Sequence, residues 1–167
     1  MGLIFRYQGQ GPEAQKSFRN ALDADPRHVG ALVNLGALDY EYALFEDAAL
    51  KFLDALEIKR NDEEALCNLA LALKKTGHLD YAKIAFEEAV NVSPGNTFIL
   101  SNYMMYLLEQ KQFDQFNRVM THAKRVMDKS EMDTITKLHE EFNAAIQGRE
   151  IREIKFVQNE LEDNPQN

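Results

Sequence analysis

The sequence predicts an all-α fold, an α-solenoid of antiparallel helical hairpins, on three observations. One motif, a phenylalanine with a small residue four positions before it and another three after, recurs at a fixed spacing, called here the repeat interval (Ala14, Phe18, Ala21; Ala48, Phe52, Ala55; Ala82, Phe86, Ala89). Pro26 and Pro94 stand two repeat intervals apart. A helical apolar face precedes the last motif and stops at Gly77 (Leu66, Leu69, Ala70, Leu73). Small residues let two helices approach closely and the phenylalanine fills the gap, so each interval is expected to be one hairpin.

The first element is expected to be short. Counting back by the repeat interval aligns Gly2 with Gly36, so the chain opens inside a repeat and its first helix has two or three turns at most. Pro12 suits the first turn of the next helix, which is expected to run to about Asp23. This incomplete first repeat leaves an apolar N-terminal edge as a candidate interface (Leu3, Ile4, Phe5, Tyr7).

The second to fourth repeats follow at the same interval. Helices are expected over 29–42 and 45–58, with Ala43 in place of a turn glycine and Asp39 in place of a bulky residue. The third repeat, 63–94, is the regular one. The fourth is expected over 97–111 and 114–127, but there Phe116 and Met120 replace the small residue and the phenylalanine. Residues 1–128 are therefore predicted to form about three and a half repeats, the first incomplete and the fourth degenerate.

After residue 128 the interval stops but helical periodicity continues. Two narrow apolar stripes predict capping helices over 129–162, followed by a polar tail over 163–167 (Met132, Ile135, Leu138, Phe142; Ile151, Ile154, Val157, Leu161). Narrow stripes on charged helices suit an end cap or a partner-facing helix. Whether the last helix folds back into a groove of the repeats is an alternative that the sequence leaves open.

Composition limits the classes of function. The chain has 167 residues, enough for one domain with a sizeable core, and a net charge of -8, which disfavours nucleic-acid binding through a basic face. The single cysteine, Cys67, cannot form an intrachain disulfide, so a cytoplasmic or other reducing intracellular compartment is expected. No apolar run is long enough to predict a transmembrane helix, and no secretory signal is visible.

The repeat pattern resembles the tetratricopeptide repeat family. The resemblance rests on the Ala-Phe-Ala motifs and on matching first-helix positions (Leu32, Leu35, Gly36; Leu66, Leu69, Ala70). It covers residues 1–128, strongly to Pro94, and implies a scaffold that binds other proteins. A narrower resemblance links short segments to a tetratricopeptide subunit of the BBSome, a ciliary coat for membrane-protein cargo (Ala82-Lys83, Glu88-Ala89-Val90, Asn102-Tyr103, Ser130-Glu131-Met132, Lys137-Leu138).

Asn34, Asn68 and Asn102 follow one another at the repeat interval, and the family register places them on the concave side. A side-chain amide can pair with both polar groups of a peptide backbone, so the row predicts a site for an extended segment. The alternative is that each amide only satisfies local backbone groups. The other residues expected in this concave groove are apolar (Val33, Ala37, Leu71, Met105, Leu108), which favours a partner with hydrophobic anchors in extended or helical form.

Two further features of the sequence bear on binding. Family members that clamp acidic chaperone tails use basic residues where this chain has Glu64 and Asn68, so that function is not expected. Four basic residues spaced by four, three and four positions would share one helical face and could dock an acidic partner, the alternative being a solvated face (Arg118, His122, Arg125, Lys129).

No catalytic, metal-binding or cofactor-binding motif is visible. His139-Glu140-Glu141 lacks the second histidine of a zincin helix, and no glycine-rich phosphate loop occurs. We therefore expect a non-enzymatic scaffold, with no metal or cofactor, that holds partner segments in its concave groove within a larger assembly. Two alternatives stay open, a subunit of a ciliary BBSome-like coat and an accessory domain of a multidomain enzyme.

Overall fold

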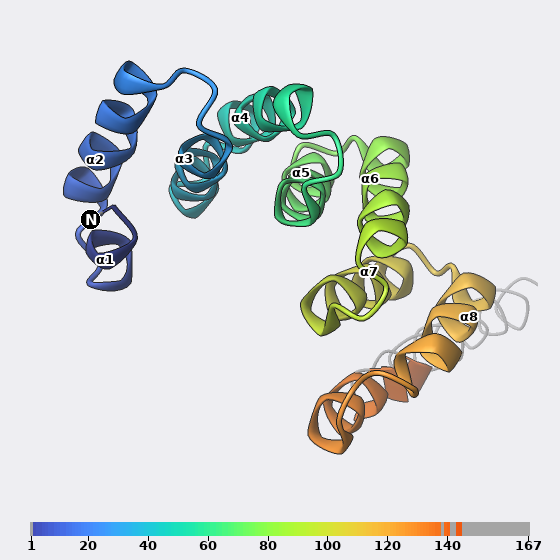
Figure 1. The fold of residues 1–167 in the computed structure, drawn as a ribbon. Helices are drawn as coiled ribbons and strands as arrows, with labels where there is room; N and C mark the ends of the chain where they lie inside the picture. The colour runs from blue at the N-terminus through green and yellow to red at the C-terminus, as the bar shows by residue number, and fades with distance from the viewer. Residues whose placement is uncertain (1, 138, 141–142, 145–167) are drawn as a thin grey trace, which may run out of the picture. The chain divides into compact units, whose positions relative to one another are not determined.

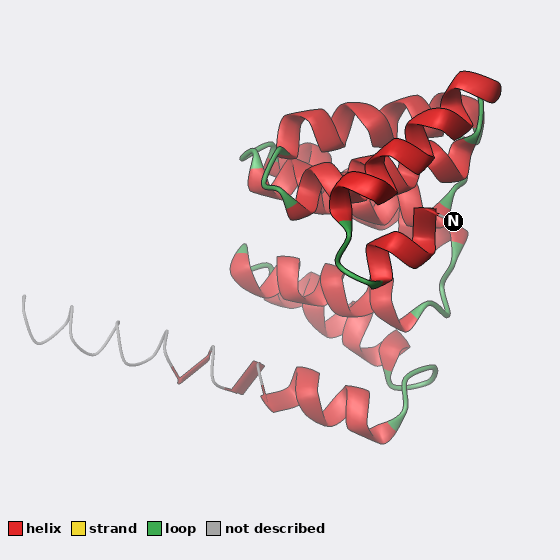
Figure 2. Ribbon diagram, turned by 90° about the vertical axis from the view of Figure 1, so that its left-hand side faces the viewer, coloured by secondary structure: helices red, strands yellow, loops and turns green. Residues whose placement is uncertain are grey.

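A computed structural model describes residues 2–137, 139–140 and 143–144. All regular structure in these residues is α-helical (Figure 2). The chain divides into two compact units, Met1–Tyr103 and Met104–Asn167, which we describe separately. The expected helix over 151–161 lies outside the described residues, as does the polar tail over 163–167. None of the described helices is both long and apolar enough to cross a membrane.

Unit 1 consists of three consecutive hairpins and the start of a fourth. The hairpins pair the following helices: α1 (Gly2–Tyr7) with α2 (Gly11–Ala24), α3 (Val29–Glu41) with α4 (Phe45–Ile58), and α5 (Glu63–Lys75) with α6 (Leu79–Val92). Figure 1 shows α1, α3 and α5 in an inner row and α2, α4 and α6 in an outer row. The expected solenoid of antiparallel hairpins is therefore confirmed, with helix ends within one or two residues of those predicted.

The recurring phenylalanines fill equivalent places between the two helices of each hairpin. Phe52 and Phe86 are fully buried and Phe18 is nearly so. A Cβ built on Gly2 would lie 2.5 Å from Cε1 of Phe18, because this glycine lets the ring pack directly against the α1 backbone. The alanine before each ring is fully buried, as are Ala55 and Ala89 after the second and third rings, whereas Ala21 is half-buried. The spacing in the sequence therefore reflects how closely the helices approach.

The turns inside the hairpins share one backbone conformation. Gly9, Ala43, Gly77 and Lys111 follow one another at the repeat interval, and all four have positive φ, at 71°, 60°, 82° and 55°. Glycine adopts this left-handed conformation without steric cost, whereas alanine and lysine do not. The turn of the second repeat therefore keeps the geometry of the others even though it lacks the glycine.

Unit 2 contains the end of α7 (Thr97–Glu109), α8 (Phe113–Ala123) and a helical segment over 129–137. Phe116 and Met120 are buried, as their places in the degenerate fourth repeat require. The prediction of a helix to residue 127 was wrong, because α8 ends at Ala123 and a turn follows over 124–126. The amide of Lys124 still donates to Met120 O, after which the chain leaves the helix.

Candidate binding groove

A groove of about 480 Å³ lies on the inner row of unit 1. Its walls come mainly from α1, α3, α5 and the first turn of α7, with Phe52 of α4 and Asn96 just before α7. Residues far apart in the sequence therefore share one surface (Arg6, Ala37, Tyr40, Glu41, Phe52, Glu63, Glu64, Cys67, Asn68, Leu71, Asn96, Phe98, Ile99). The groove thus crosses neighbouring repeats instead of lying within one hairpin. That arrangement suits a ligand that runs along the inner row.

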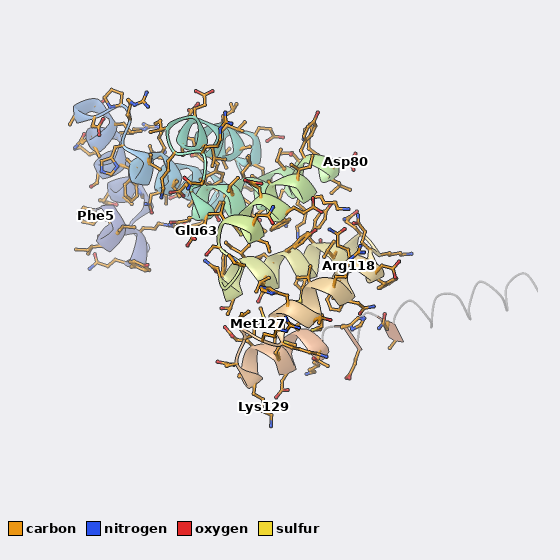
Figure 3. All side chains as sticks on the ribbon, turned by 45° about the vertical axis from the view of Figure 1, so that its right-hand side comes forward. Phe5, Glu63, Asp80, Arg118, Met127 and Lys129 are labelled. Carbon is orange, nitrogen blue, oxygen red and sulfur yellow. The ribbon has the colours of Figure 1, made fainter. Side chains whose placement is uncertain are left out.

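The lining of the groove contains both apolar and charged residues. Ala37 and Leu71 occupy equivalent positions of α3 and α5, one repeat apart, and both line the groove. Glu63 and Glu64 in the first turn of α5 also line it and are exposed. Figure 3 shows Glu63 on the same side of unit 1 as Phe5, with Asp80 on the other side. The groove therefore combines apolar walls with an acidic edge.

Arg6 closes the groove at its α1 end through a network with α3. Its Nε and Nη2 atoms donate to Glu41 Oε1 at 3.0 and 2.7 Å. Its Nη1 atom donates to Asn34 Oδ1 at 3.2 Å. A guanidinium that meets a carboxylate through two donors forms a stronger and more directional contact than a single neutral hydrogen bond. These hydrogen bonds, together with apolar packing, therefore hold the short helix α1 against α3.

The three asparagines are not equivalent. Asn34 Nδ2 donates to Gly30 O at 2.7 Å, and Asn102 Nδ2 donates to Phe98 O at 2.8 Å. These bonds to the carbonyl four residues back are the local backbone contacts that form the alternative to ligand binding. Asn68 differs from them because it lines the groove itself.

The structure places the predicted apolar groove residues in different surroundings. Ala37 and Leu71 line the groove. Val33 is buried in a core cluster between α3, α4 and α5, and its assignment to a partner-contacting surface is corrected to the core. Leu108 is also buried and offers no side-chain surface, while Met105 is half-buried in unit 2. Helical register alone does not separate groove walls from core.

Cys67 is a buried thiol in the wall of the groove. Loss of solvent raises the pKa of this thiol to about 12, and the negative charge of Glu64 adds to the shift. The thiolate is the nucleophilic and metal-binding form of cysteine. Cys67 is therefore held as a neutral packing residue under physiological conditions.

The N-terminal edge is apolar and largely exposed. Leu3, Ile4 and Tyr7 have exposed side chains, and that of Tyr7 is 90% exposed. Phe5 differs from them because it packs, half-buried, against the core cluster around Phe18. Three of the four residues expected at this edge are thus at the surface, and Phe5 anchors α1 to its neighbours.

The predicted basic face is not one helical face. Arg118 lies on α8, which ends at Ala123, whereas Arg125 falls in the following turn and Lys129 begins the next helical segment. Figure 3 shows Arg118 and Lys129 at different ends of unit 2. The continuous helix that would have aligned these residues with His122 is interrupted, and that prediction is corrected.

A second, apolar groove of about 1020 Å³ lies on the outer row, between α4 and α6 and over α5. Tyr81 and Ile84 on α6 are 66% and 60% exposed, and Leu53 on α4 is 46% exposed. The equivalent positions one repeat earlier carry Asp47, Leu50 and Arg19, two of which are charged. The hairpin architecture therefore does not require this apolar surface.

Sequence reasoning missed part of the inner groove. Arg6, Glu41, Glu63 and Asn96 were not expected there, and Glu64 was expected only as a residue that disfavours an acidic chaperone tail. Asp62, which precedes these two glutamates, caps α5 by accepting from Ala65 N at 3.0 Å. One signal was available for Arg6, which stands one repeat interval before Tyr40, another residue of the lining.

Comparison with known proteins agrees with the hairpin architecture. Residues 63–96 match the tetratricopeptide repeat family model. The fold is similar to the crystal structure of MamA, with a TM-score of 0.67 and 17% identity over 95% of this chain and 97% of that one. MamA residues 41 to the end from Desulfovibrio magneticus RS-1 give a TM-score of 0.63 and 19% identity over 80% and 72% of the two chains.

A third similar structure contains a peptide. The first tetratricopeptide domain of Spaghetti (RPAP3), bound to the HSP90 peptide SRMEEVD, gives a TM-score of 0.63 and 20% identity over 66% of this chain and 89% of that one. Among curated proteins, a BBSome complex member BBS4 homolog of Drosophila melanogaster is 24% identical over 137 residues. That match covers 76% of this chain and 28% of the relative, so the chain spans little more than a quarter of the relative's length.

Proposed function

We propose that this chain, which has the tetratricopeptide-repeat fold, is a non-enzymatic scaffold whose inner groove holds a segment of a partner protein. Proteins of this fold bind other proteins, and the observation that carries the proposal is the groove of about 480 Å³ shared by neighbouring repeats. Asn68 supplies donors and an acceptor for a peptide backbone, and Leu71 supplies apolar contact beside it. The partner segment would be extended or helical.

Charge argues against an acidic chaperone tail as the partner. RPAP3 is solved with a peptide that ends Glu-Glu-Val-Asp. In this chain Glu63 and Glu64 line the groove, and Arg6 at its far end is already bonded to Glu41. An acidic tail would meet two carboxylates without a basic clamp, and like charges in a partly desolvated groove lower affinity.

A second candidate function is that of a subunit in a ciliary cargo coat. The observation that favours it is the match to the BBSome complex member BBS4 homolog over 137 residues. A coat subunit would use the same groove, or its exposed N-terminal edge around Ile4, to join neighbouring subunits. This function predicts that the tagged chain co-purifies with BBSome members from ciliated cells. Purification without them would exclude it and leave the scaffold function intact.

The compartment proposed for either function is reducing and intracellular, as the free thiol of Cys67 favours. A cilium would satisfy this condition for the coat function. Localisation of a tagged full-length protein tests the proposal, and secretion into the medium would contradict it.

The groove is tested by truncating two of its side chains. Asn68→Ala with Leu71→Ala removes an amide and an apolar wall and keeps two good helix formers on α5. The matched control is Tyr81→Ala with Ile84→Ala, which removes two exposed side chains from the outer groove. Wild type and both variants are used as bait in affinity purification from native lysate with quantitative mass spectrometry.

The scaffold function predicts proteins that are enriched with wild type and with the outer-groove variant but lost with the inner-groove variant. Circular dichroism and the melting temperature should match wild type for both variants. Loss of the same proteins only with the outer-groove variant would move the binding site to the outer row. Retention by both variants would contradict a groove-based function.

A further inference from the structure

Resting on the groove function proposed above, we infer that the bound segment carries an arginine or lysine side chain, seated on the α5 wall between Glu64, Asn68 and Phe98. An apolar residue of the same segment would occupy the adjacent wall at Leu71. Four observations of unit 1 support this choice of partner chemistry. They are an internal arginine already held in the groove, an asparagine and a glutamate on one side of α5, an exposed aromatic ring, and the charge balance of the lining.

The internal arginine shows how this groove receives a guanidinium. Arg6 reaches from α1 to α3, where Glu41 accepts two of its hydrogen bonds and Asn34 accepts a third. The acceptors are one carboxylate and one side-chain amide oxygen on a single helix. Arginine suits such a site because its planar donors meet several acceptors at once.

An asparagine and a glutamate also lie on α5, although Glu64 stands at the position equivalent to Gly30 and the position equivalent to Glu41 carries Lys75. Asn68 is one repeat interval after Asn34, and Glu64 lies four positions before Asn68, so Glu64 and Asn68 face the same side of the helix. Both line the groove. Asn34 and Glu41 offer an amide and a carboxylate to Arg6 of the same chain. Glu64 and Asn68 offer the same two groups to a ligand from outside the chain.

An exposed aromatic ring lies next to this pair. Phe98 stands one repeat interval after Glu64, so the two occupy equivalent positions on neighbouring inner helices, and both line the groove. Phe98 is 58% exposed, so its ring is accessible to a ligand. A cation over an aromatic face gains electrostatic energy, and a nearby carboxylate adds to it.

The charge balance of the lining favours a basic ligand. Among the described residues that line the groove, Arg6 is the only basic one, whereas Glu41, Glu63 and Glu64 are acidic. Arg6 is paired with Glu41 at 2.7 Å. Asn96 Nδ2 donates to Glu63 Oε1 at 3.4 Å, which holds one carboxylate at the edge without neutralising it. A basic side chain would lower the net negative charge of the lining and gain from the apolar surroundings.

The inference is tested with an array of ten-residue peptides on a Gly/Ser background. Each peptide has two leucines at varied spacing and, at each remaining position in turn, arginine, lysine, glutamine or glutamate. The strongest binders are then measured by fluorescence anisotropy against wild type, Glu63→Gln with Glu64→Gln, and a control with the same loss of charge on the outer groove, Glu57→Gln with Glu88→Gln.

The expected result is that basic peptides bind best, and that the inner-groove variant weakens the best arginine peptide about tenfold without changing its glutamine analogue. The outer-groove control should bind like wild type. Equal or tighter binding of glutamate peptides, no binding of basic peptides, or equal loss with the control variant would each overturn the inference.

The scaffold function is judged separately in the same experiment. If neutral or acidic peptides bind and their binding is lost with Asn68→Ala and Leu71→Ala, the groove function stands and only the basic specificity is wrong. If basic peptides bind and that variant has no effect, both the groove and its specificity are contradicted.

Discussion

A Cβ placed on Gly36 would lie 2.7 Å from Cε1 of Phe52, closer than side chains pack in folded proteins. The backbone of α3 therefore rests directly on the aromatic ring of α4. The third repeat has Ala70 at the equivalent place, and both Ala70 and its partner Phe86 are fully buried. One architecture thus accommodates a methyl group in one hairpin and excludes it in the neighbouring one.

Gly36→Ala should destabilise the protein by about 1 kcal/mol or more, because the added methyl overpacks the contact with Phe52. Helix propensity alone would favour alanine by about 1 kcal/mol, so the two effects have opposite signs. Urea unfolding followed by circular dichroism measures the net change. Ala70→Gly is the reverse control and should lose about the propensity difference. An increase in stability for Gly36→Ala would show that the α3–α4 spacing adapts.

Ala43→Gly and Lys111→Gly should each stabilise the protein by about 0.5–1 kcal/mol, because both positions have positive φ. Glycine removes the steric cost of the left-handed conformation. It also raises the conformational entropy of the unfolded chain, which offsets part of this stabilisation. Thermal unfolding measures the shift. Gly77→Ala at the equivalent turn should have the opposite sign, and a destabilising effect of Ala43→Gly would contradict the turn geometry.

The hairpins could be predicted from the sequence because their signal is local and repeated. Phe18, Phe52 and Phe86 mark the hairpins by spacing alone, and each spacing reflects contacts inside one repeat. The end of α8 at Ala123 was not predictable in this way. The apolar periodicity continues through Met127, which is buried although it lies beyond the helix.

The groove was only partly predictable because it depends on contacts between repeats. The register identified Asn68, Ala37 and Leu71, which do line it. It could not show that Arg6 would bond to Asn34 across 28 positions of sequence, or that Val33 would turn into the core. Side-chain direction and inter-repeat stacking decide such details, and neither is encoded in a spacing.

Asp39→Leu should raise the free energy of unfolding at pH 7 by about 1 kcal/mol. Asp39 is buried where the other repeats carry Phe5, Leu73 and Leu107, and its Oδ2 atom is 3.9 Å from Lys51 Nζ. Burial raises the pKa of Asp39 above its usual value of 3.8, more than the positive charge of Lys51 lowers it.

The pH dependence of Asp39→Leu follows from the sign of that shift. A raised pKa means that the folded state holds the proton more tightly than the unfolded state, so ionisation of Asp39 costs stability. The advantage of the variant should be full above the folded pKa and should shrink as the pH falls toward 3.8. Unfolding curves of wild type and variant at several pH values measure it. An advantage that grows on acidification would contradict the assignment.

Cys67 should react slowly with thiol reagents in the folded protein. With its pKa raised to about 12, the thiolate fraction at pH 8 is about one in ten thousand. The same cysteine in urea should have a thiolate fraction of roughly one in ten and react about a thousandfold faster. The rate of reaction with a disulfide reagent, with and without urea, checks this. Rapid labelling of the native protein would show that the inner wall opens at Cys67.

Site-specific photo-crosslinking tests the binding groove most directly. The photoreactive amino acid p-benzoylphenylalanine replaces either Phe98 in the inner groove or Tyr81 in the outer groove, and both positions carry exposed aromatic rings. Irradiation of cells that express each variant is followed by detection of covalent adducts. We predict adducts with partner protein from position 98 and none from position 81. Adducts from position 81 alone, or from neither position, would contradict the claim that partners bind in the inner groove.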